Sequence, residues 1–351
     1  EPLLEKTLPR LTPEGSAAAV ELPTLMPPDA QLDRIATRIA GQAGLIVCGP
    51  GRFEAEFAPS VTRLAEKLNC PLLADPLSGL RFGDHDRARI LCHYDAFLRR
   101  AAFCNRYRPP WVLRFGNMPV SRSLLDYLQH LQSGKLIVVD PYGRWPDPLH
   151  RTGEMLRATP QAVCDGLAAR VACPPPAGWW EAFSQQEQVT AQLCHDLSVS
   201  GHWFEAQLVP ALLDRLPAGG LLFAGNSMPV RELDSFSGQF EKPLQLIANR
   251  GASGIDGHVS TLLGLATAAG DSTTVAGLIG DLAFYHDMNG LLAARDCNAT
   301  LIVINNDGGG IFRYLPQAGL EAFERYTPPD PHAPGRYASL DKLVNKYKGR
   351  L

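Results

Sequence analysis

Short apolar runs alternate along the chain with longer segments in which apolar residues recur at helical spacing. In the first half, the apolar runs of strand length are 44–48, 71–74, 111–115 and 135–140. The segments with helical spacing between them are 31–42, 57–68 and 121–131. Strands that alternate with amphipathic helices are typical of a parallel sheet covered by helices on both faces. The pattern therefore predicts a doubly wound parallel sheet in this half.

The same alternation returns after a proline-rich break at 173–178 (CPPPAG). The predicted strands of this second half are 221–224, 244–248, 274–279 and 299–305. Its predicted helices are 179–198, 204–216, 259–269 and 287–295. We therefore predict an α/β fold with two doubly wound parallel-sheet domains. We place a linker at 1–27, a first domain at 28–173 and a second domain at 179–351.

Composition and charge restrict the class of protein. Of the 351 residues, 45% are apolar and 20% are charged, which is an ordinary globular balance. The net charge of -3 gives no long-range field that would attract nucleic acid or an anionic membrane. No apolar run approaches the roughly 20 residues that span a bilayer. The eight cysteines are scattered without a CxxC pair, so we expect reduced thiols and a cytoplasmic protein.

Polar residues follow two predicted strands of the second domain. Gly280 and Asp281 follow the strand 274–279, and Asn306 follows the last predicted strand. The carboxyl ends of parallel strands meet at one edge of a sheet, where such folds bind ligands. A carboxylate, an amide oxygen and the carbonyl of Gly308 would suit Mg²⁺ and leave coordination positions for phosphate oxygens. A helix predicted to begin near Ala283 would direct free N–H groups at the same phosphates.

Each of these signals also has a simpler interpretation. A Gly-Asp pair after a strand is usually a turn or a helix cap, and an Asn-Asn-Asp-Gly stretch is usually a turn. Their combination, separated by residues that predict a helix and then a buried strand, is much less common. We therefore favour a site for a metal ion and a diphosphate.

The segment 280–312 (GDLAFYHDMNGLLAARDCNATLIVINNDGGGIF) resembles the GD…NN signature of thiamine-diphosphate enzymes. It departs from that signature at Leu282, where the family usually has glycine, and in a short spacing. The segments 225–232 (GNSMPVRE) and 249–257 (NRGASGIDG) resemble the 2-succinyl-5-enolpyruvyl-6-hydroxy-3-cyclohexene-1-carboxylate (SEPHCHC) synthases of menaquinone biosynthesis. A looser resemblance covers about residues 1–320.

The resemblance implies a cofactor, a metal ion and two substrates. The cofactor is thiamine diphosphate with Mg²⁺ or Mn²⁺, and the metal ligands are Asp281, Asn306 and Gly308. The residues expected to contact the cofactor are Asn226, Ser227, Ser253, Ile255, Gly280, Asp281, Leu282, Ala283, Asn306, Gly308 and Ile311. The residues expected at the substrates are Ser227, Arg231, Arg250, Ile311, Phe312 and Leu315.

The implied substrates, 2-oxoglutarate and isochorismate, are dicarboxylates, and arginine is the residue whose planar donors match a carboxylate. Arg231 and Arg250 lie close after predicted strands, so we expect both at the ligand-binding edge, although either alone is more often a surface residue. Ile255 and Ile311 are apolar residues in glycine-rich loops. We expect Ile255 under the cofactor rings and Ile311 in the substrate pocket wall; both could instead be ordinary loop anchors.

Three functions remain open at this stage. The first is a decarboxylating carboligase that joins the succinyl-semialdehyde unit of 2-oxoglutarate to isochorismate. The second is a thiamine-diphosphate enzyme of the acetolactate synthase type, whose pyruvate needs no second carboxylate clamp. The third is an inactive fragment or scaffold.

The family resemblance also implies an N-terminal pyrimidine-binding domain with a catalytic glutamate, and a homodimer or homotetramer with active sites at the subunit interface. We expect this sequence to lack that domain and to be inactive alone. After about residue 320 the sequence no longer resembles the family.

The first domain has two weaker signals. The segment 49–54 (GPGRFE) follows a predicted strand, as a dinucleotide-binding loop does, but it lacks the third glycine of that motif, so we do not favour NAD or FAD. Four polar residues could be read as zinc ligands, namely His85, Asp86, His93 and Asp95. Their spacing fits neither a helix face nor a zinc motif, so we expect them on the surface of a domain that is mainly scaffold.

Overall fold

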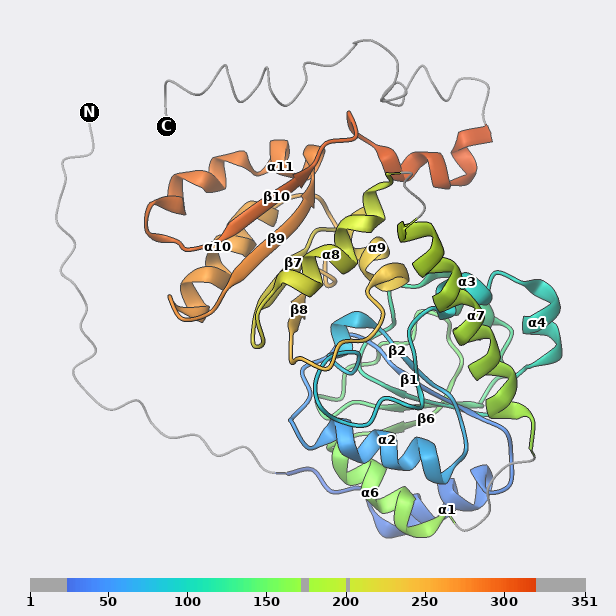
Figure 1. Ribbon diagram of the computed structural model, residues 1–351. Helices are drawn as coiled ribbons and strands as arrows, with labels where there is room; N and C mark the ends of the chain where they lie inside the picture. Colours follow the sequence, from blue (N-terminus) through green and yellow to red (C-terminus); the bar gives the residue numbers. More distant parts are fainter. Residues whose placement is uncertain (1–23, 172–176, 200–202, 320–351) are drawn as a thin grey trace, which may run out of the picture.

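The structure is a computed structural model that describes residues 24–171, 177–199 and 203–319 (Figure 1). Most of the predicted linker at 1–27 and of the proline-rich break at 173–178 lies outside the described residues, and so does the segment after 319. Along the part of the chain that is described, no helix combines the length and the apolar character needed to cross a membrane.

The first half forms a six-stranded parallel sheet with the strand order β3-β2-β1-β4-β5-β6. The strands are β1 (Leu45–Cys48), β2 (Leu72–Ala74), β3 (Ile90–Leu91), β4 (Val112–Phe115), β5 (Leu136–Val139) and β6 (Thr152–Leu156). The helices are α1 (Asp29–Ile39), α2 (Phe57–Lys67), η1 (Pro76–Ser78), α3 (Tyr94–Phe97), α4 (Ala101–Arg106), α5 (Arg122–Gln129) and α6 (Pro160–Arg170).

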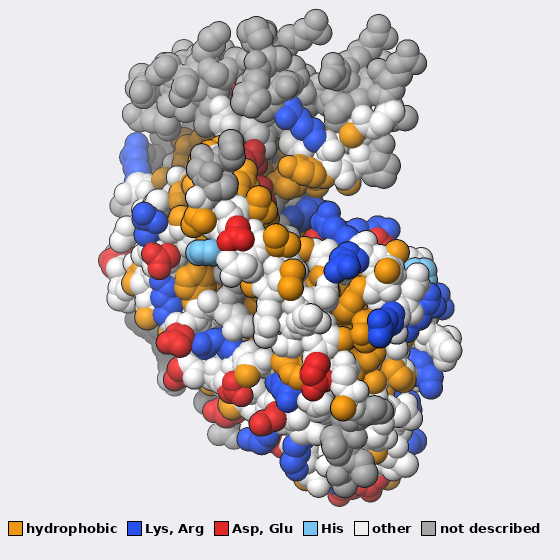
Figure 2. Space-filling view, turned by 45° about the vertical axis from the view of Figure 1, so that its right-hand side comes forward, with side chains coloured by type: hydrophobic (Ala, Val, Ile, Leu, Met, Phe, Trp, Pro, Cys, Tyr) orange, Lys and Arg blue, Asp and Glu red, His pale blue; other side chains and the backbone are white. Residues whose placement is uncertain are grey.

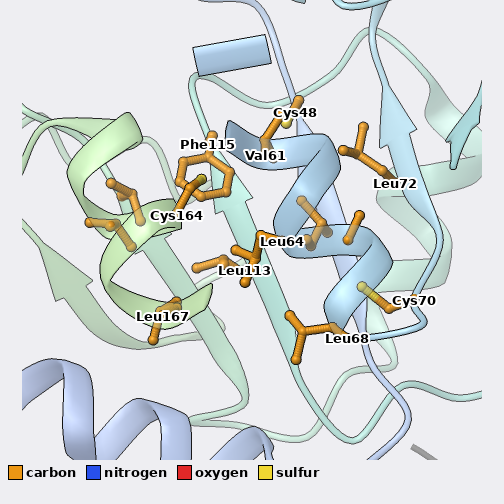
Figure 3. Close-up of a cluster of buried hydrophobic side chains, with 14 of the residues drawn as sticks. Cys48, Val61, Leu64, Leu68, Cys70, Leu72, Leu113, Phe115, Cys164 and Leu167 are labelled. Atoms are coloured by element: carbon orange, nitrogen blue, oxygen red, sulfur yellow. The ribbon is translucent and has the colours of Figure 1, made fainter. Parts of the chain in front are cut away.

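Both faces of this sheet are buried. Ile46 and Cys48 of β1 pack with α1, α2 and α6, and the close-up of this cluster shows Cys48, Val61 of α2 and Cys164 of α6 among its members (Figure 3). Leu45 and Val47 point to the opposite face, where they pack with α3 and α5. Because alternate side chains of a strand enter opposite layers, a strand covered on both faces must be apolar throughout. This explains the continuous apolar runs.

The second half forms a four-stranded parallel sheet with the order β10-β9-β7-β8. The strands are β7 (Leu221–Ala224), β8 (Gln245–Ile247), β9 (Val275–Gly280) and β10 (Thr300–Ile304). The helices are α7 (Trp179–Val199), η2 (Glu205–Gln207), α8 (Leu208–Arg215), α9 (Met228–Phe236), α10 (His258–Ala269), α11 (Asp281–His286), η3 (Met288–Asp296), η4 (Gly310–Tyr314) and η5 (Pro316–Gly319). Two sheets that are parallel throughout confirm the predicted fold class.

The helix predicted at 287–295 is present as a 3₁₀-helix. This helix, η3, follows the short α11. Leu291 and Ala294 of η3, and Cys297 directly after it, recur every three positions and pack against the core beside α10. Three residues per turn place such side chains in one row, so the 3₁₀ geometry suits this contact.

The two sheets are joined by interlocking segments. Helix α7 precedes the second sheet, yet its Phe183 belongs to the core of the first. Conversely, Leu77 and Phe82 from the first half belong to the core of the second sheet. Phe82 forms an isolated parallel bridge with Phe240, supported by hydrogen bonds from Gly83 N to Phe240 O (3.1 Å) and from Phe240 N to Arg81 O (3.0 Å).

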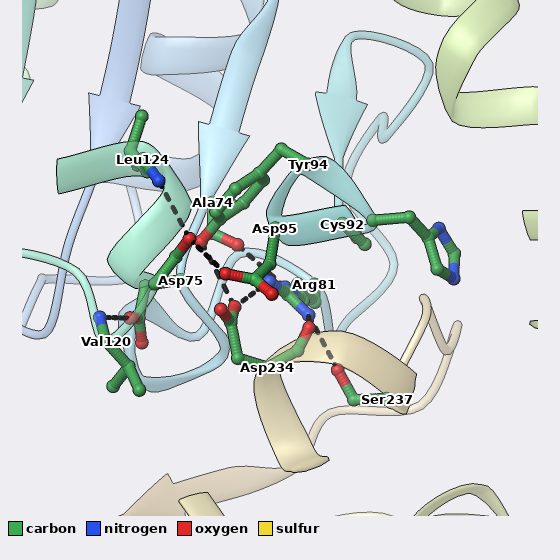
Figure 4. A network of polar contacts seen from close by, with 12 residues as sticks. Ala74, Asp75, Arg81, Cys92, Tyr94, Asp95, Val120, Leu124, Asp234 and Ser237 are labelled. Carbon is green, nitrogen blue, oxygen red and sulfur yellow. Dashed lines mark hydrogen bonds and ion pairs between the residues drawn. The ribbon is translucent and has the colours of Figure 1, made fainter. Parts of the chain in front are cut away.

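A buried arginine lies at the centre of this contact (Figure 4). The Arg81 side chain is fully buried, and its Nη2 lies 2.7 Å from Asp234 Oδ1 of α9. Its Nε donates to Ala74 O (2.7 Å), and its Nη1 donates to Asp234 O (2.6 Å) and Ser237 Oγ (2.9 Å). The Tyr94 hydroxyl donates to the same Asp234 oxygen (3.2 Å). Arg81 therefore binds both the side chain and the C-terminal end of α9.

Candidate active site

The order of the second sheet reverses between β7 and β9. The chain passes from β7 to β8 on one side, and then crosses to β9 and β10 on the other. In open α/β sheets, ligands bind at the carboxyl ends of the strands beside such a reversal. Asn226 follows β7 and Asp281 follows β9. The two strands are neighbours, and Ala224 of β7 pairs with Leu278 of β9. The structure thus brings two predicted site residues to the position where this fold binds ligands.

The three predicted metal ligands lie together at this edge. Ile304 of β10 pairs with Gly280 of β9, so the chain continues from adjacent positions to Asn306 and Asp281. The carboxylate of Asp281 accepts a hydrogen bond from the N–H group of Leu282 at 2.9 Å. Burial raises the pKa of Asp281, and the nearby backbone N–H groups of Leu282 and Gly308 oppose the rise.

Asn306 supplies the observation that tests whether a metal ion would fit. Its Oδ1 is buried and has no hydrogen-bond partner, whereas its Nδ2 donates to Glu205 Oε2 at 3.5 Å. An unpartnered buried oxygen is unusual in a folded protein, and an amide oxygen beside a carboxylate is a suitable pair for a hard cation. Among the described residues no group of three His, Cys, Asp or Glu could hold a metal ion. A cation here would therefore depend on Asp281, Asn306, the Gly308 carbonyl and oxygens of a bound phosphate.

The helix after Asp281 differs from expectation. It was predicted to begin near Ala283, but α11 begins at Asp281 and has six residues. Leu282, at the position where the family usually has glycine, is 43% exposed, whereas Ala283 is buried. The Leu282 N–H is occupied by the Asp281 carboxylate.

Asn226 connects the loops that carry the two predicted substrate arginines. It is buried; its Oδ1 accepts from Arg250 Nη1 (2.9 Å), and its Nδ2 donates to Gly254 O (2.8 Å). Ser227 has a φ of 73° and a ψ of -128°, a strained conformation for a residue other than glycine. Arg231, one turn along α9, donates from Nη1 to the Ser227 carbonyl (2.6 Å).

Arg231 and Arg250 lie close enough to repel each other. Burial and then the charge of Arg250 lower the pKa of Arg231. Two guanidinium groups in one region are stabilised by an anion between them. On the face drawn in Figure 2, basic side chains gather beside a hollow at the upper right of the view.

The predicted apolar contacts lie on separate loops of the same region. Ile255 lies in the loop before α10 and is 37% exposed, and Phe312 in η4 is 42% exposed. Ile311 and Leu315 are half-buried, and Ser253 is exposed. Two cavities of the described chain lie elsewhere: one of about 340 Å³ between α10 and η3, and one of about 190 Å³ near His93. The candidate site is therefore an open edge of the sheet and not one of these two cavities.

Two buried polar residues beside the site, and the half-buried Glu205 near one of them, were not anticipated. His258 at the start of α10 is fully buried, and its Nε2 lies 3.5 Å from Asn226 Nδ2. Glu232 of α9 is buried and contacts Glu205; burial, and then the charge of Glu205, raises the pKa of Glu232 to about 8. In the sequence, the only signal for Glu232 is its place one residue after Arg231.

In the first sheet, the corresponding reversal between β1 and β4 is closed by backbone. Gly49 N donates to Phe115 O (2.9 Å) and Asn117 N donates to Pro50 O (2.8 Å). A Cβ atom on Gly49 would lie 1.7 Å from Asn117 O. The glycine of the segment 49–54 thus allows two loops to approach each other, which is a structural role.

The prediction that the four polar residues of the first half lie on the surface is wrong for Asp95, and the two histidines are only partly exposed. Asp95 is buried and accepts from Ser121 Oγ at 2.6 Å. His93 is half-buried, and its Nδ1 lies 2.8 Å from Glu187 Oε1 of α7. Both pair with residues far along the chain, which their local spacing could not reveal. His85 is half-buried and Asp86 is exposed.

Comparison with known proteins finds similarity to thiamine pyrophosphate enzymes and to one named synthase. The family model described as "Middle domain of thiamine pyrophosphate" matches residues 27–224. A 2-succinyl-5-enolpyruvyl-6-hydroxy-3-cyclohexene-1-carboxylate synthase of Geobacillus kaustophilus is 43% identical, over 89% of this chain and 53% of the relative. A synthase of the same name from Chloroflexus aurantiacus is 45% identical, over 82% and 50% of the two chains. The chain spans about half the length of the curated relatives it matches.

Proposed function

The chain belongs to the family of thiamine pyrophosphate enzymes, and from this premise we propose that it is the cofactor-binding part of a SEPHCHC synthase. The complete enzyme is a decarboxylating carboligase of menaquinone biosynthesis that joins the succinyl-semialdehyde unit of 2-oxoglutarate to isochorismate. The observation that carries the proposal is the buried, unpartnered Oδ1 of Asn306, which follows β10 at the same edge of the second sheet as Asp281. The names of the relatives support the reaction.

The metal ion is Mg²⁺ or Mn²⁺, because its ligands are hard oxygens from Asp281, Asn306 and Gly308. Thiamine diphosphate, when bound, supplies the carbon nucleophile and the electron sink for decarboxylation. Asn226, Ser227 and Ser253, with Gly280, Leu282 and Ala283 on the other side, form the surroundings of the cofactor. Ile255 would supply an apolar contact to its rings.

The substrate carboxylates are bound by Arg231 and Arg250. Burial, and then the charge of Arg250, lowers the pKa of Arg231, and a carboxylate between the two arginines would offset their mutual repulsion. The Ser227 hydroxyl donates to the substrate, and its strained backbone is held in place by Arg231. Ile311, Phe312 and Leu315 form the apolar wall that excludes water from the reacting atoms. A pyruvate-specific enzyme of the acetolactate synthase type would not need two arginines at this position.

The active form is a homodimer or homotetramer in the cytoplasm. Exposed apolar side chains at the open site edge, Ile255, Leu282 and Phe312, support an arrangement in which another domain covers them. The cysteines of the described residues are all free, which suits a reducing compartment.

Binding of the cofactor and consumption of the substrates test the proposal together. In the full-length protein, Asp281→Ala should weaken thiamine diphosphate binding in the presence of Mg²⁺ by about 10- to 100-fold, the range seen when metal sites lose a supporting group. Asp271→Ala, which removes an exposed carboxylate remote from the edge, is the matched control. The wild-type protein should consume isochorismate with 2-oxoglutarate and not with pyruvate. Unchanged cofactor affinity in Asp281→Ala, or turnover with pyruvate alone, would overturn the assignment.

A further inference from the structure

The amide of Asn306 is confined between two groups. On one side, Glu205 Oε2 of η2 accepts a hydrogen bond from Asn306 Nδ2 at 3.5 Å. On another, Gly310 leaves room for the same nitrogen, because a Cβ atom there would lie 2.5 Å from Nδ2. The other end of the amide, Oδ1, is buried and unpartnered.

An asparagine amide has a donor end and an acceptor end, and only the acceptor end can bind a cation. If the Asn306 amide turned over, its NH₂ group would face the metal ion and its oxygen would face the Glu205 carboxylate. Both contacts would then be repulsive. The Glu205 carboxylate therefore favours the orientation in which the Asn306 nitrogen faces Glu205 and Oδ1 remains free to bind a cation.

A second carboxyl group lies near Glu205. Glu232 of α9 is buried, and burial, together with the charge of Glu205, raises its pKa. Glu205 lies in η2, 101 positions before Asn306 in the sequence, so three separate segments meet behind the metal site.

We propose that Glu205 is a positioning residue of the metal site, which holds the Asn306 amide with Oδ1 toward the cation. The inference rests on the proposed function, because Asn306 is there a metal ligand. Residues that orient metal ligands typically contribute 10- to 100-fold to metal affinity. Glu205 itself does not touch the cation, the cofactor or the substrates.

The test is the Mn²⁺ affinity of the full-length protein with thiamine diphosphate, followed by the EPR signal of free Mn²⁺. Glu205→Met keeps the length of the side chain and removes the acceptor, so Mn²⁺ should bind about 10- to 100-fold more weakly. Glu205→Gln retains an amide oxygen that can accept from Nδ2, so it should restore most of the affinity. The exposed Glu241 provides the control variant Glu241→Met, which should bind Mn²⁺ as the wild type does.

Gly310→Ala tests the same amide from its other side. The added methyl group would press on Asn306 Nδ2, so it should also weaken Mn²⁺ binding, and this variant decides the matter if Glu205→Met does not fold. If Glu205→Met binds Mn²⁺ with wild-type affinity, the proposed role of Glu205 is wrong. If only Gly310→Ala folds, wild-type affinity in that variant has the same consequence. Asp281→Ala distinguishes a wrong metal site from a wrong role for Glu205. If Asp281→Ala also binds Mn²⁺ with wild-type affinity, the proposed metal site is wrong. If Asp281→Ala loses Mn²⁺ binding while Glu205→Met keeps it, only the role of Glu205 is wrong.

Discussion

The stability of the contact between the two sheets should depend on the charge of the Asp234 carboxylate. Asp234→Asn keeps the size of the side chain and leaves the Arg81 guanidinium buried without its counter-charge. Breaking one partner of a buried ion pair costs about 3–5 kcal/mol. In this variant Arg81 retains its hydrogen bonds to Ala74 O, Asp234 O and Ser237 Oγ. We therefore expect the free energy of unfolding to fall by about 3 kcal/mol, at the lower end of that range.

The measurement is urea unfolding of the full-length protein, followed by tryptophan fluorescence and by circular dichroism. Three further variants form a double-mutant cycle with the wild type: Arg81→Leu, Asp234→Leu, and the two substitutions combined. Replacing a whole buried ion pair by apolar residues is often neutral, so the double variant should be more stable than Arg81→Leu alone. Ser237→Ala, which removes one neutral hydrogen bond, should cost only about 1 kcal/mol.

Two results would refute the reasoning. If Asp234→Asn lowers the free energy of unfolding by less than about 1 kcal/mol, the Arg81–Asp234 pair contributes no more than an ordinary exposed ion pair, despite its burial. Additive effects of the Arg81 and Asp234 variants would show that the two side chains do not interact. The outcome also bears on the site, because Asp234 lies one turn after Arg231 on α9, and a loosened α9 would displace that arginine.

Two further predictions concern the site directly. Arg231→Lys and Arg250→Lys each lose the planar pair of donors, so KM for the dicarboxylate substrates should rise about 10- to 150-fold, as expected for a lost charge-assisted hydrogen bond, while thiamine diphosphate affinity is unchanged. Wild-type kinetics in both variants would contradict the clamp. Burial and the neighbouring Glu205 raise the pKa of Glu232 from 4.5 to about 8, so in this window the folded chain binds a proton that the unfolded chain has released. The free energy of unfolding should therefore fall as pH rises from about 4.5 to about 8, and Glu232→Gln should flatten this slope; identical curves would show that Glu232 is not protonated in the fold.

The strands could be predicted where burial on both faces makes the sequence apolar throughout. β1 and β5 are of this kind, and their residues are all buried. β6 was missed because Thr152–Leu156 (TGEML) is an edge strand with a single fully buried residue. α9 was missed because its buried face includes Glu232 and Asp234. A hydrophobic pattern treats such residues as exposed, and only the tertiary partners Arg81 and Glu205 explain their burial.

Some residues of the site could likewise be predicted from the sequence and others could not, depending on what fixes the position of each residue. In a parallel sheet, chain direction alone brings the residues after β7, β9 and β10 to one edge, so the sequence is enough to group Asn226, Asp281 and Asn306. Nothing comparable brings Glu205 to Asn306, because η2 reaches the back of the site only through the packing of α9 and the loop before it. The residues that would bind the ligands can therefore be predicted from the sequence, whereas the residues that orient those side chains can be identified only from the packing in the structure. Variants that alter metal affinity without changing a ligand should consequently include residues of η2, as well as Gly310, which packs against the Asn306 amide.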